Sequence, residues 1–240
     1  MRYAQLATRN LKTIWRDPLS LGLTVALPAV LLVVLQALGG VDTFFTATVL
    51  APGIALFGFV MLMFSTAMAL SRDRESALFS RLLTAPLRSN DFVAGYSLPY
   101  VPVAIAQGVG IFAIGAFFDL EIKGSVILVA LVLLAMAVFY IALGMILGAT
   151  LDVAPISGAY AVILLLTIFG GAWVDLEAIG GVFRSAAAAF PFAHALDAVR
   201  AVMIDGAGFA DIATDFSWVV AYTVGAVALA ILLFRRKMAE

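Results

Sequence analysis

The sequence predicts an all-α membrane protein with six transmembrane helices. Of its 240 residues, 64% are hydrophobic and 12% are charged, whereas soluble domains are roughly half apolar and a quarter charged. Apolar runs of about 20 residues, the length that a helix needs to cross the bilayer, recur along the chain. Short polar or charged segments separate them. We therefore expect residues 1–240 to form a single transmembrane domain.

The first 17 residues are too charged to cross a membrane, and they are expected to form an interfacial helix. On a helical wheel, polar residues occupy one face and apolar residues the other. A helix with this pattern lies along the membrane surface with its apolar face toward the lipid. The polar face contains Arg2, Gln5, Arg9, Lys12 and Arg16, and the apolar face contains Ala4, Ala7, Leu11, Ile14 and Trp15.

Six apolar runs then follow, each long enough to span the bilayer as a helix. Prolines at positions 28, 99 and 102 fall inside the first and third runs. Each proline removes a backbone donor, so both helices are expected to be kinked. The spans are expected near Leu19–Leu38, Val49–Leu70, Phe92–Phe118, Ser125–Leu151, Pro155–Trp173 and Ser217–Phe234.

The distribution of Lys and Arg between the loops predicts the orientation. The N-terminal segment carries four, the loop after the second span four and the C-terminal tail three, which makes eleven, against three on the other side. Because cytoplasmic loops are enriched in Lys and Arg, we expect a multi-pass protein of the plasma (inner) membrane of a prokaryote with both termini cytoplasmic. The formal net charge of −1 gives no sign of a nucleic-acid partner.

The predicted spans contain no Asp, Glu, Lys, Arg or His. Transporters driven by ion gradients keep such groups at membrane depth to bind the coupling ion, so the energy for any transport is expected to come from outside the bilayer. The polar residues Gln36, Gln107 and Thr167 remain as candidates for a substrate pathway. Hydrogen bonds between helices are the more ordinary role for such residues.

Motifs for catalysis are missing from the sequence. There is no GxxxxGK[ST] phosphate loop, no GxSxG, no HExxH and no cysteine. The chain is therefore expected to be no enzyme, with no catalytic, cofactor-binding or metal-binding residues of its own. If ATP drives this protein, another chain binds the ATP.

The loop after the second span has helical periodicity. Leucines at positions 78 and 82 lie four residues apart, arginines recur at 74, 81 and 88, and Pro86 ends the pattern. A short amphipathic helix between two spans can dock into a soluble partner and transmit its motion. A basic loop resting on anionic lipid head groups fits the same spacing. The spacing alone leaves both interpretations open.

Two further regions allow alternative interpretations. Leu176–Phe190 and Phe192–Met203 are too short to span, so they form either a half-inserted hairpin or an ordinary loop with two surface helices. The glycines of Gly144–Gly148, in the sequence GMILG, permit close helix packing within the subunit or in a dimer. Three residues at helical spacing, namely His194, Asp197 and Arg200, form either a small polar site or a hydrogen-bonded surface cluster.

Two segments resemble a known family. RESALFSRLLTAPL resembles the first cytoplasmic loop of permeases in the type-2 ATP-binding-cassette export family, although Ala77 and Ser80 stand where many members have Gly and Glu. PFAHALDAVRAVM resembles the family's segment before the last span. The first match lies on Glu75, Ala77, Arg81, Leu82, Pro86 and Leu87, and the second on Pro191, Asp197 and Arg200.

The resemblance implies a role for each segment. Residues 1–17 would be the connecting helix, 72–88 a cytoplasmic coupling helix, and 176–208 the outer re-entrant helices. The implied ATPase-coupling residues are Arg74, Glu75, Leu78, Arg81, Leu82, Leu83 and Pro86, and the implied outer residues are Pro191, His194, Asp197 and Arg200.

The resemblance also implies the partners. Two permease subunits, as a homodimer or heterodimer, would sit in membrane lipid on two copies of a P-loop ATPase subunit, which would bind ATP and Mg. The apolar spans favour a lipid-like or amphipathic, drug-like cargo. A stand-alone channel or secondary transporter, and a non-transporting membrane anchor subunit, are the alternatives.

Overall fold

The protein is a bundle of long apolar helices. The computed structural model describes residues 2–38, 45–76, 89–174 and 176–237, and this part of the chain contains helices and no strand. The elements are α1 (Arg2–Arg16), α2 (Pro18–Leu38), α3 (Ala47–Arg74), α5 (Ser89–Ser97), η2 (Leu98–Tyr100), α6 (Val101–Gly115), η3 (Ala116–Phe118), α7 (Val126–Thr150), α8 (Val153–Thr167), η4 (Ile168–Ala172), α9 (Leu176–Ile179), α10 (Gly181–Ala187), α11 (Pro191–Arg200), η5 (Ala201–Asp205) and α12 (Phe209–Lys237).

Six of the helical stretches are long and apolar enough to cross a membrane. They coincide with the six predicted spans, so the predicted fold class is confirmed. Two boundaries were predicted too short: α3 continues to Arg74, and α12 begins at Phe209. In each case the helix extends beyond its apolar stretch into polar residues, because backbone hydrogen bonding continues where hydrophobicity stops. Proline 99 lies in η2, a 3₁₀ turn that interrupts the third span between α5 and α6.

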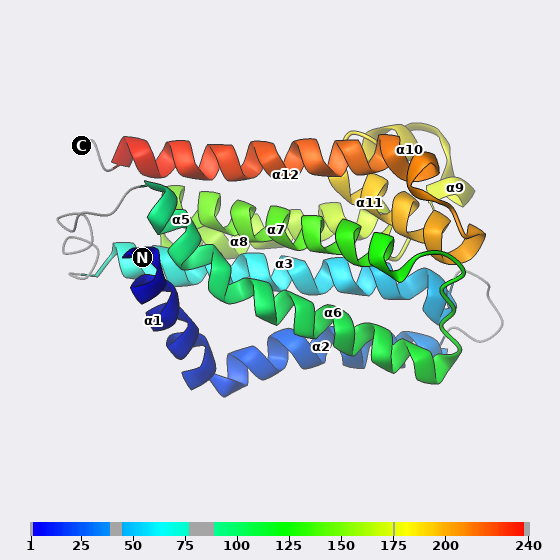
Figure 1. Cartoon of the computed structure of the whole chain (residues 1–240), viewed down its shortest axis with the longest axis horizontal. Coiled ribbons are helices and arrows are strands. Elements are labelled where there is room, and N and C mark those ends of the chain that lie inside the picture. The colour runs from blue at the N-terminus through cyan, green and yellow to red at the C-terminus, as the bar shows by residue number, and fades with distance from the viewer. Residues whose placement is uncertain (1, 39–44, 77–88, 175, 238–240) are drawn as a thin grey trace.

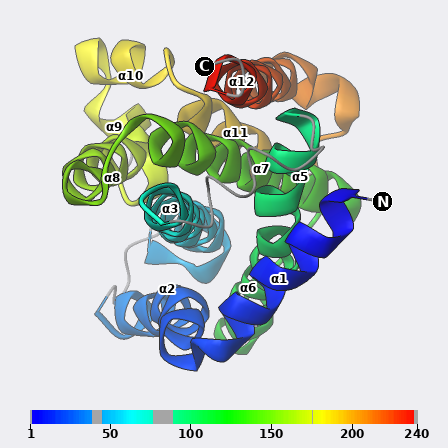
Figure 2. The ribbon, with the colours of Figure 1, turned by 90° about the vertical axis from the view of Figure 1, so that its left-hand side faces the viewer.

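The central helix is α3, which packs against α2, α6, α7, α8 and α11. Figure 2, which looks along the bundle, shows α3 surrounded by these helices. Close packing with α7 depends on Gly144 and Gly148. A Cβ atom at Gly148 would lie 2.6 Å from the carbonyl oxygen of Ala67, and one at Gly144 would overlap the carbonyl oxygen of Met63. The GMILG pattern therefore serves packing within the subunit.

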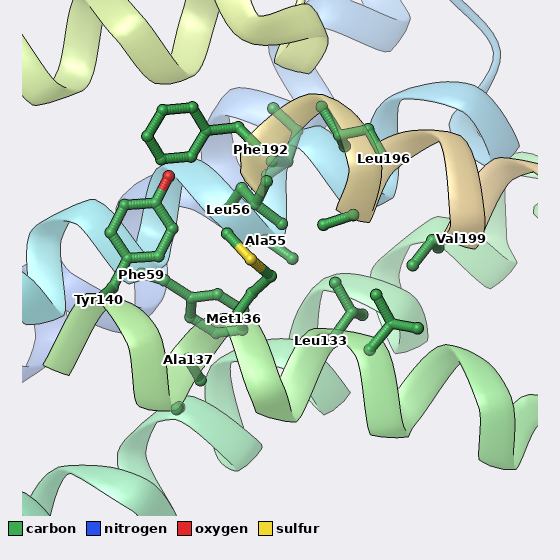
Figure 3. Close-up of a cluster of buried hydrophobic side chains, with 14 of the residues drawn as sticks. Ala55, Leu56, Phe59, Leu133, Met136, Ala137, Tyr140, Phe192, Leu196 and Val199 are labelled. Atoms are coloured by element: carbon green, nitrogen blue, oxygen red, sulfur yellow. The ribbon is translucent and has the colours of Figure 1, made fainter. Parts of the chain in front are cut away.

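Helix α11 is buried at the end of the bundle opposite the termini. Its apolar face packs against α3 and α7 in the hydrophobic core (Figure 3). Phe192 stacks on the ring of Tyr140 with centroids 5.8 Å apart. At the preceding corner Gly171, which lies inside η4, has φ 104°, a conformation that favours glycine. Gly180 and Gly181, at the junction of α9 and α10, also have positive φ, of 61° and 58°.

The pair formed by α10 and the α11–η5 segment is bent by 97°. Counted as one span, the pair would give the chain seven crossings. An odd number of crossings places the two termini at opposite ends, whereas Figure 1 shows both termini at the same end of the bundle. The arrangement therefore fits a segment that enters and leaves on one side.

Helix α1 crosses the end of the bundle that carries the termini (Figures 1 and 2). Its inner face contains Leu6 and Asn10, and the Asn10 side chain donates to the carbonyl of Gly95, 3.0 Å away in α5. Leu6 was not part of the predicted apolar face. Trp15, which was, is 67% exposed. The location of α1 in the membrane interface stays a prediction.

Candidate functional site

The richest group of polar contacts lies at the end that carries both termini. We call it the terminal network and define it by Arg9, Ser71, Asp73, Arg74, Glu75 and Tyr96. Four of these residues lie in or directly after the last turn of α3. Residues 77–88 follow immediately in the sequence. The terminal network therefore occupies the junction between the central helix and the loop that was predicted to couple.

Asp73 joins two helices to α3. Its Oδ1 atom lies 3.0 Å from Nη2 of Arg9 in α1, and its Oδ2 atom accepts a 2.7 Å hydrogen bond from the hydroxyl of Tyr96 in α5. Burial by itself lowers the pKa of the Arg9 guanidinium, but the hydrogen bond and the charge of Asp73 outweigh burial. The pKa of Arg9 is therefore raised above its ordinary value, which makes this a charged contact.

Arg74 and Ser71 join α3 to the end of α7. The Nη1 atom of Arg74 donates to the carbonyl oxygens of Gly148 and Leu151, at 2.9 and 3.1 Å, and Ser71 Oγ donates to Leu151 at 3.0 Å. The last carbonyls of a helix have no partners within the helix, and they lie at the negative end of its dipole. The Arg74 guanidinium supplies both the hydrogen-bond donors that these carbonyls lack and a positive charge at the negative end of the dipole.

The turn between α7 and α8 belongs to the same junction. Arg74 lies 3.8 Å from the carboxylate of Asp152, and Glu75 accepts a 3.4 Å hydrogen bond from the backbone N–H of Val153, the first residue of α8. The terminal network thus ties the last turn of α3 to α1, α5, α7 and α8. Each of these contacts joins α3 to another helix or to the turn between α7 and α8.

The predicted coupling residues fall into two groups. Arg74 and Glu75 contact the α7–α8 turn, and residues 72–74 form the end of α3. The coupling helix itself stays a prediction. The remaining predicted positions lie outside the described residues. These are Leu78, Arg81, Leu82, Leu83 and Pro86.

At the opposite end, His194 fixes α11 to its neighbours. Its Nδ1 atom lies 2.7 Å from a carboxylate oxygen of Asp215 in α12, and Nε2 lies 2.9 Å from the carbonyl oxygen of Ala188. The imidazole ring stacks on Trp218 with centroids 5.3 Å apart. Both ring nitrogens and one ring face thus contact neighbouring groups, and His194 anchors the α10–α11 segment to the last span.

The other outer residues contact different partners. Asp197 accepts a 2.7 Å hydrogen bond from Arg184 of α10. Arg200 donates to the carbonyls of Val49, at 3.2 Å, and Gly171, at 2.9 Å, and so connects α11 to α3 and η4. Pro191 is buried in the first turn of α11. The structure therefore distributes these residues over separate contacts and does not bring them together in one polar site.

The three polar residues inside the spans make hydrogen bonds between segments. Gln36 donates to the carbonyl of Phe45 at 2.7 Å, and Thr167 shares a 2.7 Å hydrogen bond with the hydroxyl of Tyr140. Gln107 is fully buried and donates to the carbonyl of Thr24 at 3.0 Å, which joins α6 to α2. Packing explains these contacts, and a role of the three residues in a pathway stays a prediction.

Sequence reasoning missed Asp73, Tyr96 and Asp215. Asp73 offered a signal, because it lies between Arg72 and Arg74 at the end of an apolar run, where a half-buried carboxylate needs a partner. Asp215 was placed before the last span, although it lies inside α12. Nothing in the spacing indicated Tyr96, because its partner is 23 residues away.

Comparison with known proteins identifies the family of this chain. A family model described as ABC-2 type transporter matches residues 2–204. A similar curated protein is ABC transporter G family member 20 of Dictyostelium discoideum, which is 23% identical over 194 residues, or 78% of this chain. The match spans only 27% of that relative's length. Because the family model matches most of this chain, the chain belongs to the ABC-2 type transporter family.

Proposed function

We propose that this chain, an ABC-2 membrane component, forms the substrate pathway of an ATP-driven exporter and takes mechanical work from a separate ATPase subunit. The observation that supports the proposal best is the terminal network. It concentrates contacts with four other helices on the last turn of α3, directly before residues 77–88. A displacement of that loop would therefore reach much of the bundle through one turn.

The proposed transmission relies on short polar contacts. Movement of the loop shifts Asp73 and Arg74, and the partners of these two side chains move α1, α5 and α7 with them. Packed helices respond to such a shift by moving between discrete arrangements. ATP binding on the partner would thus bias the bundle between two states, provided that the partner contacts the loop differently in each.

The proposed assembly contains two permease subunits, identical or paired with a paralogue, and two P-loop ATPase subunits. ATP and Mg would bind to the ATPase chains. We propose that the termini and residues 77–88 lie in the cytoplasm of a prokaryotic cell, since the sequence segments assigned to that side carry eleven of the 14 Lys and Arg residues. The α9–α11 segment would then form the half-inserted outer hairpin.

Thiol labelling tests the orientation. The chain has no cysteine, so Ser76→Cys and Ser185→Cys each introduce one thiol at an exposed position. In sealed inside-out vesicles, a membrane-impermeant maleimide is expected to label the Ser76→Cys variant and spare the Ser185→Cys variant. Right-side-out vesicles should give the reverse pattern. Labelling of both variants from the same side would disprove the orientation.

The cargo is proposed to be lipid-like or amphipathic. The six predicted spans contain no ionisable residue, and buried polar side chains such as Gln107 and Thr167 already bond to neighbouring helices. Such an interior offers little to a small ion, which needs charged or multiple polar ligands to replace its water. Apolar contact is what the interior can offer.

The decisive experiment combines Leu82→Asp and Leu83→Asp in the complex with its ATPase. We expect loss of ATPase co-purification or of ATP-driven export, while the thermal stability of the permease in detergent stays unchanged. The control is Arg236→Asp, which also adds negative charge at this end. Unchanged export in the double variant would refute coupling through this loop.

The same reconstitution discriminates between the alternatives. Substrate flux through the purified chain without any ATPase would instead favour a stand-alone channel or secondary transporter. A complex that binds the ATPase but shows no export of any amphipathic cargo would favour a membrane anchor. Export that stops when the ATPase carries an inactive phosphate loop is the result expected from the proposed function.

A further inference from the structure

A cavity of about 300 Å³ lies between α1, α2, α3 and the α5–η2 segment. Helix α1 forms one wall of the cavity with Arg9, Asn10, Thr13 and Ile14. The face of α3 that lines it reaches from Leu62 to Asp73, which corresponds to roughly 16 Å of helix. The cavity thus extends from the terminal network toward the middle of the bundle.

The polarity of the cavity wall changes along this length. The deep part is apolar and includes Leu62 and Val103, and Ser65 lies one turn of α3 nearer the terminal network. The wall also carries charged groups, namely the guanidinium groups of Arg9 and Arg72 and the carboxylates of Asp17 and Asp73. A phospholipid has the same succession from acyl chain through ester groups to a charged head group.

The cationic groups of the wall retain donors that the protein leaves unused. Asp73 is occupied by Arg9 and Tyr96, whereas Nη1 of Arg9 is buried and donates to no acceptor in the described part of the chain. Arg72 forms no ion pair with a described residue and is exposed. Unsatisfied guanidinium donors favour an oxyanion, and their planar geometry suits phosphate.

We propose that this cavity binds the phosphate head group of a membrane phospholipid from the leaflet at the terminal end. A lipid is favoured over a soluble phosphate compound because the inner wall is apolar and Phe64 and Met68 continue the apolar surface beside the charged groups. The volume is at the lower limit for a ligand pocket, so the head group enters while the acyl chains lie along the helices.

The test of this binding site does not depend on the proposed function, because binding is measured on the isolated 240-residue chain without an ATPase. The chain is purified in detergent, freed of lipid and titrated with dioleoylphosphatidylglycerol, and adducts are followed by native mass spectrometry. Dioleoylglycerol lacks the phosphate, and glycerol 3-phosphate lacks the acyl chains. We expect saturable binding of the phospholipid and at least about tenfold weaker binding of each of the other probes.

Two variants test the position of the site. Arg72→Gln removes an unpaired cation, and Ala69→Phe fills the cavity without changing charge. Each is expected to weaken phospholipid binding by about tenfold or more. Their matched controls are Arg236→Gln and Ala228→Phe, at exposed positions of α12, which should bind like the unmodified chain.

Thiol protection gives a second measurement of location. Phospholipid is expected to slow maleimide labelling of the Ser65→Cys variant in the cavity wall and to leave labelling of Ser217→Cys on α12 unchanged. The inference is overturned if Arg72→Gln binds the phospholipid with unchanged affinity. Equal affinity for dioleoylglycerol would exclude phosphate recognition, and equal affinity for glycerol 3-phosphate would exclude a lipid as the intended ligand.

Discussion

Arg9 and Asp73, 64 positions apart in sequence, form an ion pair of 3.0 Å that joins α1 to the last turn of α3. The pair is half-buried, since the side chains of Arg9 and Asp73 are 38% and 20% exposed. Screening by water is therefore weaker than at an open surface, where such a pair contributes roughly 0–1 kcal/mol. The hydroxyl of Tyr96 holds the carboxylate in place from the other side.

A double-mutant cycle measures what this pair contributes. Arg9→Gln and Asp73→Asn, alone and together, are expected to show a coupling free energy of about 1 kcal/mol in unfolding measured in detergent, because each single change removes the same contact. Lys12→Gln combined with Asp73→Asn is the control, since Lys12 forms no ion pair in the described structure. Additive effects in the first cycle would mean that the two side chains act independently.

Arg74 stabilises the end of α7. Replacing its donors in Arg74→Gln leaves the carbonyls of Gly148 and Leu151 without this charged partner, and the expected loss in unfolding free energy is about 1–2 kcal/mol. Arg74→Lys keeps the favourable charge at the helix end and is expected to lose less. In lipid-free detergent the neighbouring Arg72→Gln should change stability by under about 0.5 kcal/mol. Equal losses at both positions would contradict the capping role.

Gly148 allows α7 to approach α3. In Gly148→Ala the added methyl group meets the carbonyl oxygen of Ala67, so we expect a loss of about 1–3 kcal/mol in stability. Gly158→Ala is the matched control, because a Cβ there meets no atom within 4 Å, and it should be neutral or slightly stabilising. A change in oligomeric state without a change in stability would instead assign Gly148 to a dimer contact.

His194 holds the α10–α11 segment against α12. His194→Phe keeps a ring to stack on Trp218 but loses the contacts with Asp215 and the Ala188 carbonyl. We expect faster hydrogen exchange in α10 and α11 with little change in α3. Ser185→Ala, at an exposed position of α10, serves as the control. Unaltered exchange in α11 would show that apolar burial alone holds this segment.

Much of the fold could be predicted from local patterns. The apolar runs predicted all six spanning helices, because a membrane helix must satisfy its backbone internally and face lipid with apolar side chains. Helix ends were harder to predict. Helix α12 begins at Phe209 and includes Asp211 and Asp215, because acidic residues are favourable in the first turns of a helix.

Hydropathy and charge along the chain are enough to predict six spanning helices, positive charge concentrated in the segments on one side and no ionisable residue within the predicted spans. Which polar residues contact one another follows from the packing of the helices. Arg9 pairs with Asp73, and Arg74 donates to the end of α7. His194, Asp197 and Arg200 each contact a different partner. The hydropathy of a segment depends only on its own residues. A hydrogen bond between distant helices depends on how those helices pack, which the spacing of residues along the chain does not predict.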